Sequence, residues 1–486
     1  MQQIKVGEQK SLRLFGRFSL LLVLCISLLD AGSFEDFKRE QAESFKQFKD
    51  ERDNAFNKYL KEEFKAYKAA QGIVIYEKPK PKEIAKAKPL KTKSVGPKTT
   101  IKVKEIKHTE VKPPQQIVIE KVKEAKKDIT FNFYGSALGF NMPDGIKNAK
   151  FTPQNQKGIS SFFEGAASSE YENLVQELLS VSKAMNLNDW GIYQLVLLYS
   201  DAVFSNPDES KLLSWFLFNK LGFNVKVGLA NKHIVLMHYS KKTIYSTPNY
   251  SFSKKKFYVV SNYNKGSVGS LYTYKHDYPD ADKPLDLSIK TLPNLSSDMK
   301  SKTLKFEYLN KSYNIAYKYN QNLIDFMASY PQADYQTYFN APVDSRTYKS
   351  IATSLKKYVD GKQASDAMNF VLHFVQNAFM YQRDDQQFGR EKVMFAEETL
   401  YYDKSDCEDR AVLYSYLIKE LFGISVVGLK YKDHMATALY VPMEGDSVQK
   451  GSKKFIVADP TYINASIGQS MPKYKGLMPQ KIIQVN

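Results

Sequence analysis

The sequence contains very little cysteine. Among 486 residues only Cys25 and Cys407 carry a thiol, so a framework of disulfide bonds is excluded in any compartment. The chain also has only six histidines, and these are not spaced like the ligands of a zinc site. A glycine-rich phosphate-binding motif is missing as well. We therefore expect no metal, nucleotide or other cofactor.

Aromatic residues are missing from residues 77–130, where much of the positive charge lies. The chain has a net charge of +18, and residues 78–127 hold 16 lysines against 5 glutamates. A surface that binds single-stranded nucleic acid interleaves aromatic rings with positive charges, so we expect no nucleic-acid partner. Lysine, proline and few apolar residues cannot form a core. Residues 73–128 are therefore predicted to be a disordered linker that acts as a tether.

Long apolar runs are also few, and the one near the N-terminus covers Phe18–Leu29. Four basic residues precede it, and the small residues Ala31, Gly32 and Ser33 follow it. This run is short for a membrane-spanning helix and typical of a secretory signal. Residues 1–31 are predicted to be a signal peptide or, as the alternative, an uncleaved membrane anchor. Both place the protein in the periplasm or cell envelope of a bacterium.

Residues 32–72 are predicted to form a charged helix with an internal repeat. Aromatic residues recur every 11 positions, at Phe34, Phe45, Phe56 and Tyr67, and again three places later at Phe37, Phe48 and Tyr59. A period of 11 residues forms a nearly straight stripe on a helix. Because one helix leaves the stripe uncovered, we expect helix 34–67 to self-associate or to lie on a membrane, an envelope surface or another protein. A charged stalk with scattered aromatics is the alternative.

A globular pattern starts near Ile129 and predicts α+β structure. The predicted helices are a pair within 171–204 and one at 212–221 that ends at Gly222. Alternating residues predict strands at 223–229, 233–239 and 256–260, and a hairpin within 303–320 around Asn310-Lys311. We divide this part of the chain into residues 129–276, a connecting region at 277–345 and a last domain at 346–486.

The last domain contains SDCEDRAVLYSYLIKELFG, which predicts a helix with Cys407 in its first turn. Ser405 and Glu408 have the spacing of a capping box, and Gly423 is a typical C-terminal stop. Backbone N–H groups and the helix dipole favour a thiolate at this position, whereas the acidic residues around Cys407 oppose it. A cysteine that is simply packed in the core remains the alternative.

Two later segments, HMATALYV and KKFIVADP, are predicted to pair as antiparallel strands. If Val441 lies opposite Lys453, then His434 lies opposite Pro460 with Asp459 one place away. A thiol nucleophile needs a base with a pKa near 7, and a carboxylate fixes the tautomer of that base. Cys407, His434 and Asp459 are thus the candidate catalytic set, although Asp-Pro is also a common turn.

These segments resemble the transglutaminase-like superfamily of papain-type thiol enzymes, particularly bacterial transglutaminase-like cysteine peptidases. The resemblance rests on SDCEDRAVLYSYLIKELFGISVVGL, DHMATALYV and KKFIVADPTYINASIG, and it covers about residues 346–486. It implies a papain-like α+β fold. It also implies that Cys407 is the nucleophile, His434 the general base and acid, and Asp459 the orienting carboxylate.

An acyl-transfer site also needs hydrogen-bond donors for the oxyanion. The backbone N–H of Cys407 is the natural first donor, because it lies at a helix N-terminus. For the second donor or the cleft wall, Gln387 and Tyr402 are the candidates from the loop before the helix. His373 is expected to be a core or edge histidine.

The middle of the chain repeats this pattern in a degenerate form. LLSWFLFNKLGFNVKVGL at 212–229 resembles VLYSYLIKELFGISVVGL at 412–429. We compare the candidate positions of the two copies in order: His233 stands where His434 does, Asn206 or Pro207 replaces Cys407, and Ser261 replaces Asp459. We expect a duplicated domain that lost its nucleophile. Two unrelated α/β segments with a similar amphipathic pattern are the alternative.

The sequence thus predicts a cell-envelope thiol hydrolase, a cysteine peptidase or amidase that forms a covalent acyl-enzyme. Its partner is expected to be a peptide or protein substrate, with cell-wall peptide as one option. If an amine resolves the acyl-enzyme, the same site is a crosslinking transglutaminase. A non-enzymatic envelope binding or scaffold protein is the other alternative.

Overall fold

The computed structural model describes residues 31–63, 71–75, 84–88, 99–104, 127–263 and 265–486. The chain divides into two compact units, Met1–Glu51 and Arg52–Asn486. The predicted signal or anchor lies outside the described residues except for Ala31. Within the described part of the chain, no helix is both long enough and apolar enough to span a membrane.

The predicted N-terminal helix is present as α1 (Ala31–Glu63), and it crosses the boundary between the units. In the first unit, Phe45 and Phe48 of the aromatic stripe are exposed. In the second unit the stripe continues with Phe56, which is 4% exposed and contacts Phe163 and Trp215 of the same chain. The expectation that the whole stripe lacks a cover was therefore wrong for its C-terminal end, because the following domain supplies an aromatic partner surface.

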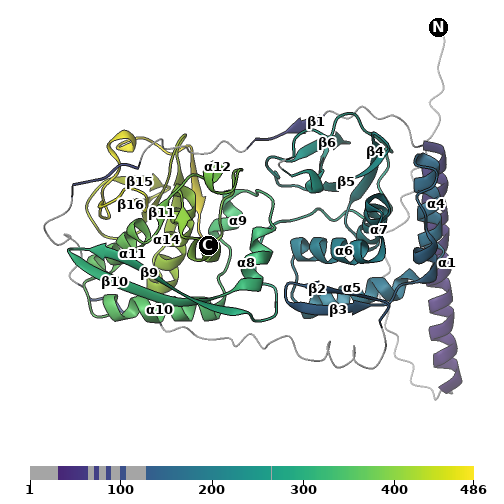
Figure 1. Ribbon diagram of the computed structural model, residues 1–486, viewed down its shortest axis with the longest axis horizontal. Coiled ribbons are helices and arrows are strands. Elements are labelled where there is room, and N and C mark those ends of the chain that lie inside the picture. Colours follow the sequence, from purple (N-terminus) through teal and green to yellow (C-terminus); the bar gives the residue numbers. More distant parts are fainter. Residues whose placement is uncertain (1–30, 64–70, 76–83, 89–98, 105–126, 264) are drawn as a thin grey trace, which may run out of the picture. The chain divides into compact units, whose positions relative to one another are not determined.

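Residues 127–295 form an N-terminal lobe of mixed α and β structure. Its helices lie beside a curled antiparallel sheet (Figure 1). The predicted helical pair and the predicted strands are confirmed. The helices are α3 (Asp144–Asn148), α4 (Gln156–Ala167), α5 (Tyr171–Ala184), α6 (Asp189–Val203) and α7 (Pro207–Lys220). The strands are β2 (Ile129–Phe133), β3 (Ser136–Phe140), β4 (Val225–Ala230), β5 (His233–Tyr239), β6 (Pro248–Phe252), β7 (Lys255–Tyr258) and β8 (Tyr272–Thr273). A short 3-10 turn, η1 (Val260–Asn262), follows β7.

The predicted hairpin is confirmed as β9 (Met299–Tyr308) and β10 (Lys311–Asn320). It turns at Leu309 and Asn310, both with positive φ, which matches a two-residue hairpin loop. We had assigned it to a connecting region, but it packs on helices of the last domain. Helix α10 (Ser345–Val359) covers β10, and the Ser354 hydroxyl accepts a hydrogen bond from the Ala316 N–H at 3.0 Å.

The C-terminal lobe contains the residues of the candidate site. Its further helices are α8 (Gln321–Ala328), α9 (Tyr335–Phe339), α11 (Ala364–Asn377), α12 (Asp384–Gln387), α13 (Ala396–Tyr401), α14 (Cys407–Phe422) and the 3-10 turn η2 (Pro472–Tyr474). Its further strands are β11 (Met380–Tyr381), β12 (Lys404–Ser405), β13 (Val426–Lys430), β14 (Met435–Leu439), β15 (Ser447–Lys450), β16 (Lys453–Ala458) and β17 (Lys481–Gln484). Helix α14 packs on β13 and β14.

The sheets of the two lobes have the same strand order. The C-terminal sheet runs β15-β16-β14-β13-β17, and the N-terminal sheet runs β6-β7-β5-β4-β8 with β1 (Gln71–Ile73) added at its edge. In both sheets the central pair has the same register: Val225 lies opposite His238, and Val426 lies opposite Leu439. Each central pair follows directly on a helix, α7 or α14. The duplicated domain itself stays a prediction.

The linker contains three described segments that bind to the lobes, so the expectation of a wholly disordered tether was wrong. β1 (Gln71–Ile73) pairs with β6, and Figure 1 shows it in purple beside the teal sheet. Gln71 and Gly72 belong to the region 32–72, so the prediction of helix was wrong for these two residues. Residues 84–88 pair with Ile463. Residues 99–104 bind beside Gln363 and donate a hydrogen bond from Lys104 to Leu421. The composition of the linker gives no core, but its main chain can still pair with the edges of folded structure.

The end of α1 is held to the N-terminal lobe by a buried ion pair, and this gives a first prediction. Lys220 Nζ lies 2.5 Å from Asp53 Oδ1, and both side chains are almost fully buried. Burial lowers the pKa of Lys220 to about 8. Lys220→Met leaves the buried Asp53 carboxylate with only Arg52, at 3.9 Å, as a nearby cation, so we expect a loss of about 3 kcal/mol in the free energy of unfolding, measured by urea denaturation.

The matched control is Lys300→Met. Lys300 pairs with Asp298 at 2.9 Å, but both side chains are about half exposed. Solvent screens such a pair, so the loss should be much smaller than in Lys220→Met. Equal losses in the two variants would contradict the structural role of the buried pair.

Candidate active site

Cys407 is the first residue of α14 and is fully buried. The helix begins at Asp406 as N-cap and ends at Gly423, whose φ of 70° matches the predicted C-terminal stop. The thiol therefore lies at the positive end of the helix dipole, as predicted. Its Sγ is 3.0 Å from Glu408 Oε2, to which it donates a hydrogen bond.

The capping box is displaced by one residue from the predicted one. The Asp409 carboxylate accepts a hydrogen bond from the Asp406 N–H at 3.2 Å, instead of Glu408 from Ser405. Both predicted residues are engaged elsewhere, because Glu408 accepts from the Cys407 thiol and the Ser405 hydroxyl accepts from an arginine of the same helix. The predicted Ser405–Glu408 box was therefore wrong, although the start of the helix was right.

That arginine, Arg410, stabilises the first turn of α14 through hydrogen bonds of its guanidinium. It is 1% exposed, and its guanidinium donates to the Ser405 hydroxyl at 3.1 Å, to the Gln376 carbonyl at 3.1 Å and to the Phe379 carbonyl at 2.8 Å. Burial lowers its pKa to about 10, so it stays charged near neutral pH. The cation ties the Cys407 turn to the C-terminal end of α11 and to β12.

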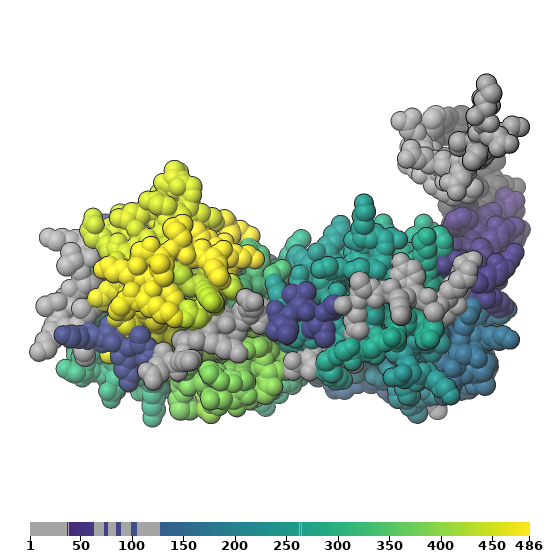
Figure 2. Space-filling model, turned by 90° about the horizontal axis from the view of Figure 1, so that it is seen from above, coloured from purple at the N-terminus to yellow at the C-terminus, as the bar shows by residue number. Residues whose placement is uncertain are grey.

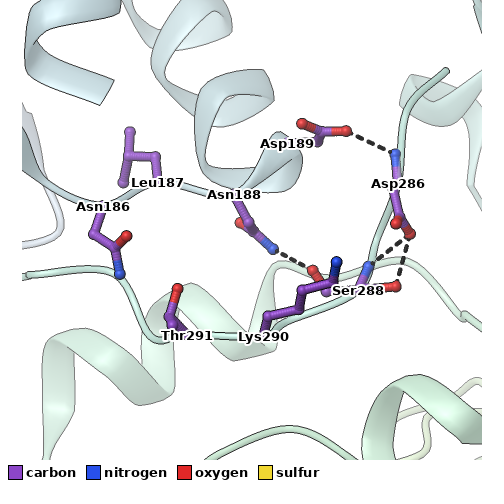
Figure 3. A pocket seen from close by; sticks show the side chains of 8 residues that line it. All are labelled: Asn186, Leu187, Asn188, Asp189, Asp286, Ser288, Lys290 and Thr291. Atoms are coloured by element: carbon purple, nitrogen blue, oxygen red, sulfur yellow. Dashed lines mark hydrogen bonds between the residues drawn. The ribbon is translucent and has the colours of Figure 1, made fainter. Parts of the chain in front are cut away.

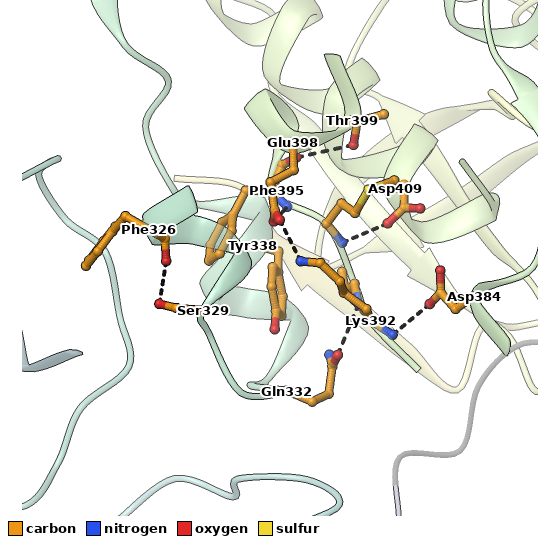
Figure 4. A network of polar contacts seen from close by, with 12 residues as sticks. Phe326, Ser329, Gln332, Tyr338, Asp384, Lys392, Phe395, Glu398, Thr399 and Asp409 are labelled. Atoms are coloured by element: carbon orange, nitrogen blue, oxygen red, sulfur yellow. Dashed lines mark hydrogen bonds and ion pairs between the residues drawn. The ribbon is translucent and has the colours of Figure 1, made fainter. Parts of the chain in front are cut away.

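Buried carboxylates beside this turn hold an extended segment, residues 392–395. Four consecutive backbone N–H groups of that segment each donate to a side chain (Figure 4). In order along the segment, the acceptors are Asp384 at 2.8 Å, Gln332 at 3.0 Å, Asp409 at 2.8 Å and Glu398 at 3.1 Å. Unpaired buried N–H groups are costly, so this acceptor set explains why so many acids lie in the interior.

Some of these acids lie close enough together to share a cation. Among the described residues, two sets have carboxylate oxygens within 4.8 Å of one another: Asp384 with Asp406 and Asp409, and Asp384 with Glu391 and Glu408. Burial, followed by the charges of Asp406 and Asp384, raises the pKa of Asp409 well above its usual range. A proton on Asp409 therefore relieves the crowding of negative charge, while Asp384 and Asp409 already serve backbone donors.

The candidate base and its carboxylate meet as the sequence predicts. His434 Nε2 lies 2.7 Å from Asp459 Oδ2, and the two side chains are 0% and 2% exposed. The other ring nitrogen, Nδ1, is buried and has no hydrogen-bond partner among the described residues. This pair fixes one tautomer of the imidazole and leaves Nδ1 as the nitrogen that can accept a proton.

The predicted strand register was wrong by one residue. Thr437 lies opposite Ala458, and β16 forms its hairpin with β15, within the segment that the sequence reading assigned to a loop. Because of this extra strand, β14 and β16 do not form the short hairpin that the predicted register assumed. Continued past the strand ends, the observed register puts Asp459 and His434 on the same face as diagonal neighbours, which explains their contact.

Gln376 holds the loop that carries Asp459. Its Nε2 donates to three carbonyl oxygens of that loop, of Asp459 at 3.0 Å, Tyr462 at 2.9 Å and Ala465 at 3.0 Å. The residue is 1% exposed on α11. The sequence did not indicate this role of Gln376, because the residue lies more than 80 positions before the loop. Only the fold brings the two together.

Two tyrosines also meet at the candidate site. The ring of Tyr474 stacks on His434 with centroids 4.9 Å apart, and its hydroxyl donates to Asp433 Oδ1 at 2.9 Å. Burial and then the hydrogen bond to Asp433 raise the pKa of Tyr474, with smaller contributions from Cys407 and Asp459. Burial and then the charges of Glu408 and Cys407 raise the pKa of Tyr335. Tyr474 therefore contacts the candidate base directly, and no sequence motif marked either tyrosine.

The oxyanion candidates have contacts of their own. Gln387 ends α12, and its backbone N–H donates to the Arg383 carbonyl at 3.0 Å. The ring of Tyr402 packs on Phe388 and Tyr401, and burial raises its pKa to about 12. Gln387 and Tyr402 remain predictions. His373 is buried against Tyr308, and burial lowers its pKa to about 4, as expected for a core histidine.

The N-terminal lobe arranges the corresponding positions differently. His233 Nδ1 lies 3.0 Å from Asp208 Oδ2 at the start of α7, and the histidine side chain is 76% exposed. Asn206 is the N-cap of α7, and its side chain accepts from the Asp208 N–H. An exposed histidine paired to a capping acid lacks the buried partner set that surrounds His434.

Two cavities of the described structure are lined by residues outside the candidate triad. One, of about 220 Å³, is lined mainly by polar residues and lies at the start of α6, where Asp189 accepts a hydrogen bond from the Asp286 N–H (Figure 3). Another of about 280 Å³ lies beside Tyr416, towards the other end of α14. In Figure 2 the last residues of the chain, in yellow, form a continuous surface on the C-terminal lobe. Because Cys407 and His434 are 0% exposed, any molecule could reach these two side chains only if part of the surrounding structure moved.

Comparison of the chain with protein-family models, with curated proteins and with solved structures gave no match. The mixed α+β class rests on the structure itself. The papain-like fold and the transglutaminase-like family remain predictions that rest on the quoted motifs.

The three hydrogen bonds of Gln376 give a prediction about the loop. Gln376→Leu keeps the volume but leaves three buried carbonyl oxygens without their donor, so we expect a loss of about 3 kcal/mol in the free energy of unfolding. Asn377→Leu, which removes one bond to a helix carbonyl, should lose about 1 kcal/mol. Urea denaturation of both variants checks this. Similar losses would show that the three bonds are not special.

Proposed function

We propose that the protein is a thiol hydrolase of the transglutaminase-like superfamily, a cysteine peptidase or amidase that acts on a peptide or protein in the cell envelope. The observation that carries the proposal is the buried His434–Asp459 pair, 2.7 Å apart, in the same lobe as a thiol at a helix N-terminus. The resemblance assigns the same three roles to Cys407, His434 and Asp459.

In the proposed reaction, Cys407 Sγ attacks the carbonyl carbon of an amide. His434 Nδ1 accepts the thiol proton, and Asp459 stabilises the imidazolium through its bond to Nε2. The Cys407 N–H stabilises the oxyanion. The imidazolium then protonates the leaving amine, and a thioester forms. Water resolves the thioester in a hydrolase, whereas a lysine amine would give a new amide, as in a crosslinking enzyme.

The resting charge state of the site follows from the acid next to the thiol. Glu408 accepts a hydrogen bond from Cys407 Sγ, and this bond favours the protonated thiol, because a thiolate beside a carboxylate is repelled. The helix dipole and the imidazole act in the opposite direction. The proposed nucleophile is therefore a thiol that His434 deprotonates during attack.

The second candidate function is a non-enzymatic envelope protein that binds or scaffolds a partner. The observation in its favour is the complete burial of Cys407 and His434, which also suits a packed core cysteine. In this case Tyr474 and His434 would be permanent packing neighbours.

The reactivity of Cys407 separates the two candidates. In a Cys25→Ser chain Cys407 is the only thiol. We expect its alkylation by iodoacetamide, followed by intact mass, to be faster below pH 8.5 than that of an ordinary thiol, because His434 accepts the thiol proton during attack, and His434→Ala to abolish this acceleration. Asp459→Asn should weaken it, because the tautomer is no longer fixed. Cys407→Ser is the blank. Alkylation that rises only near pH 8.5 and ignores His434 would favour the binding protein.

Glu408 provides an independent check on the electrostatics. Glu408→Gln removes a negative charge next to the sulfur, so alkylation at neutral pH should become about tenfold faster, which corresponds to about one pKa unit. Glu420→Gln is the matched control, because Glu420 lies at the far end of the same helix and is partly exposed. An unchanged rate for Glu408→Gln would mean that the carboxylate does not set the charge of the thiol.

A further inference from the structure

The linker segment 84–88, which we call the strap, pairs with the loop that follows Asp459. The Ala87 N–H donates to the Ile463 carbonyl at 2.8 Å, and the Ile463 N–H donates to the Ala85 carbonyl at 3.2 Å. The Asn464 side-chain amide also donates to the Ala87 carbonyl at 3.4 Å. Lys86 and Ile463 thus form an isolated parallel β-bridge, through which the strap pairs with residues 462–464, the docking edge.

The docking edge is held in place independently of the strap. Asp459 Oδ1 accepts from the backbone N–H groups of Thr461 and Tyr462, at 2.9 and 3.2 Å. Gln376 bonds the carbonyl groups of Tyr462 and Ala465. Asp459 and Gln376 therefore bond main-chain groups on both sides of Ile463. The N–H and carbonyl of Ile463 itself bond to the strap. The edge begins three residues after the candidate orienting carboxylate.

The side chains of the strap show what the edge selects. Ala85 packs against the apolar cluster that contains Met471 and Tyr474, and Tyr474 in turn stacks on His434. Lys86 and Lys88 are exposed. The strap is therefore held by its main chain and by one small side chain, and its lysines extend into solvent.

We propose that residues 462–464 are the docking edge for an extended peptide substrate with a small side chain opposite the Tyr474 cluster, and that the strap is a resident competitor for it. That the docked peptide is a substrate rests on the proposed function. Addition of a strand uses main-chain hydrogen bonds and tolerates varied sequence. Because the strap is covalently linked, its effective concentration is on the order of millimolar, so a substrate must displace it.

Hydrogen exchange at residues 460–466, read by mass spectrometry on the full chain, tests the inference. Ala87→Pro removes the N–H that bonds Ile463, and we expect the Ile463 amide to exchange at least tenfold faster. The peptide KEIAKAKPL, which has the sequence of residues 82–90, should restore protection at millimolar concentration. KEIAKPKPL, with proline at the matching place, should not.

Lys86→Pro is the matched control. In a parallel bridge centred on Lys86 and Ile463, the Lys86 N–H faces away from the edge, so this variant should exchange like the wild type. Ala85→Asp is a second release variant, which places a charge against the apolar cluster. Unchanged exchange in both release variants, failure of the first peptide to restore protection, or equal protection by both peptides would overturn the inference. Exchange does not need the thiol, so a Cys407→Ser chain should give the same result, and docking can stand even if alkylation rules out an enzyme.

Discussion

The candidate site depends on the need to satisfy buried polar groups around the first turn of α14. Arg410 places a cation under that turn and bonds the carbonyl groups of Gln376 and Phe379. Gln376 in turn holds the Asp459 loop, and Asp409 joins the helix start to residues 392–395. The elements that carry Cys407 and Asp459 are therefore connected through one set of buried hydrogen bonds. Loss of any one of these hydrogen bonds would leave an unpaired polar group in the interior, so the geometry is strongly specified.

The two lobes show how one framework can keep its topology while its polar interior changes. Both sheets have the same strand order and the same central register. In the C-terminal lobe the histidine is buried and bonded to the acid that follows β16, whereas in the N-terminal lobe His233 is exposed and bonded to an acid on α7. Apolar packing preserves the sheet, and the charge network around the helix start decides what the lobe can do.

The sequence predicted the local features well and the long-range ones poorly. Helix α14, its glycine stop, the strands around His434 and the β9–β10 hairpin follow from periodicity and turn residues within a few positions of each other. The capping box and the strand register failed because Arg410 and the extra strand β15 change local pairings from outside the motif. Gln376 and Tyr474 could not be found at all, since their roles exist only after distant segments pack. Composition was likewise misleading for the linker, because main-chain pairing is independent of side-chain type.

The attachment of the linker to both lobes also sets a mechanical limit. Ile75 follows the strand on the N-terminal sheet, and Ile84 begins the strap on the C-terminal lobe, so nine peptide units separate them. A chain of this length extends to about 32 Å at most. The linker therefore limits the distance between the two attachment points. Any motion or pulling force that separates them beyond that span must first detach one of them. The attachment with fewer hydrogen bonds would then yield first.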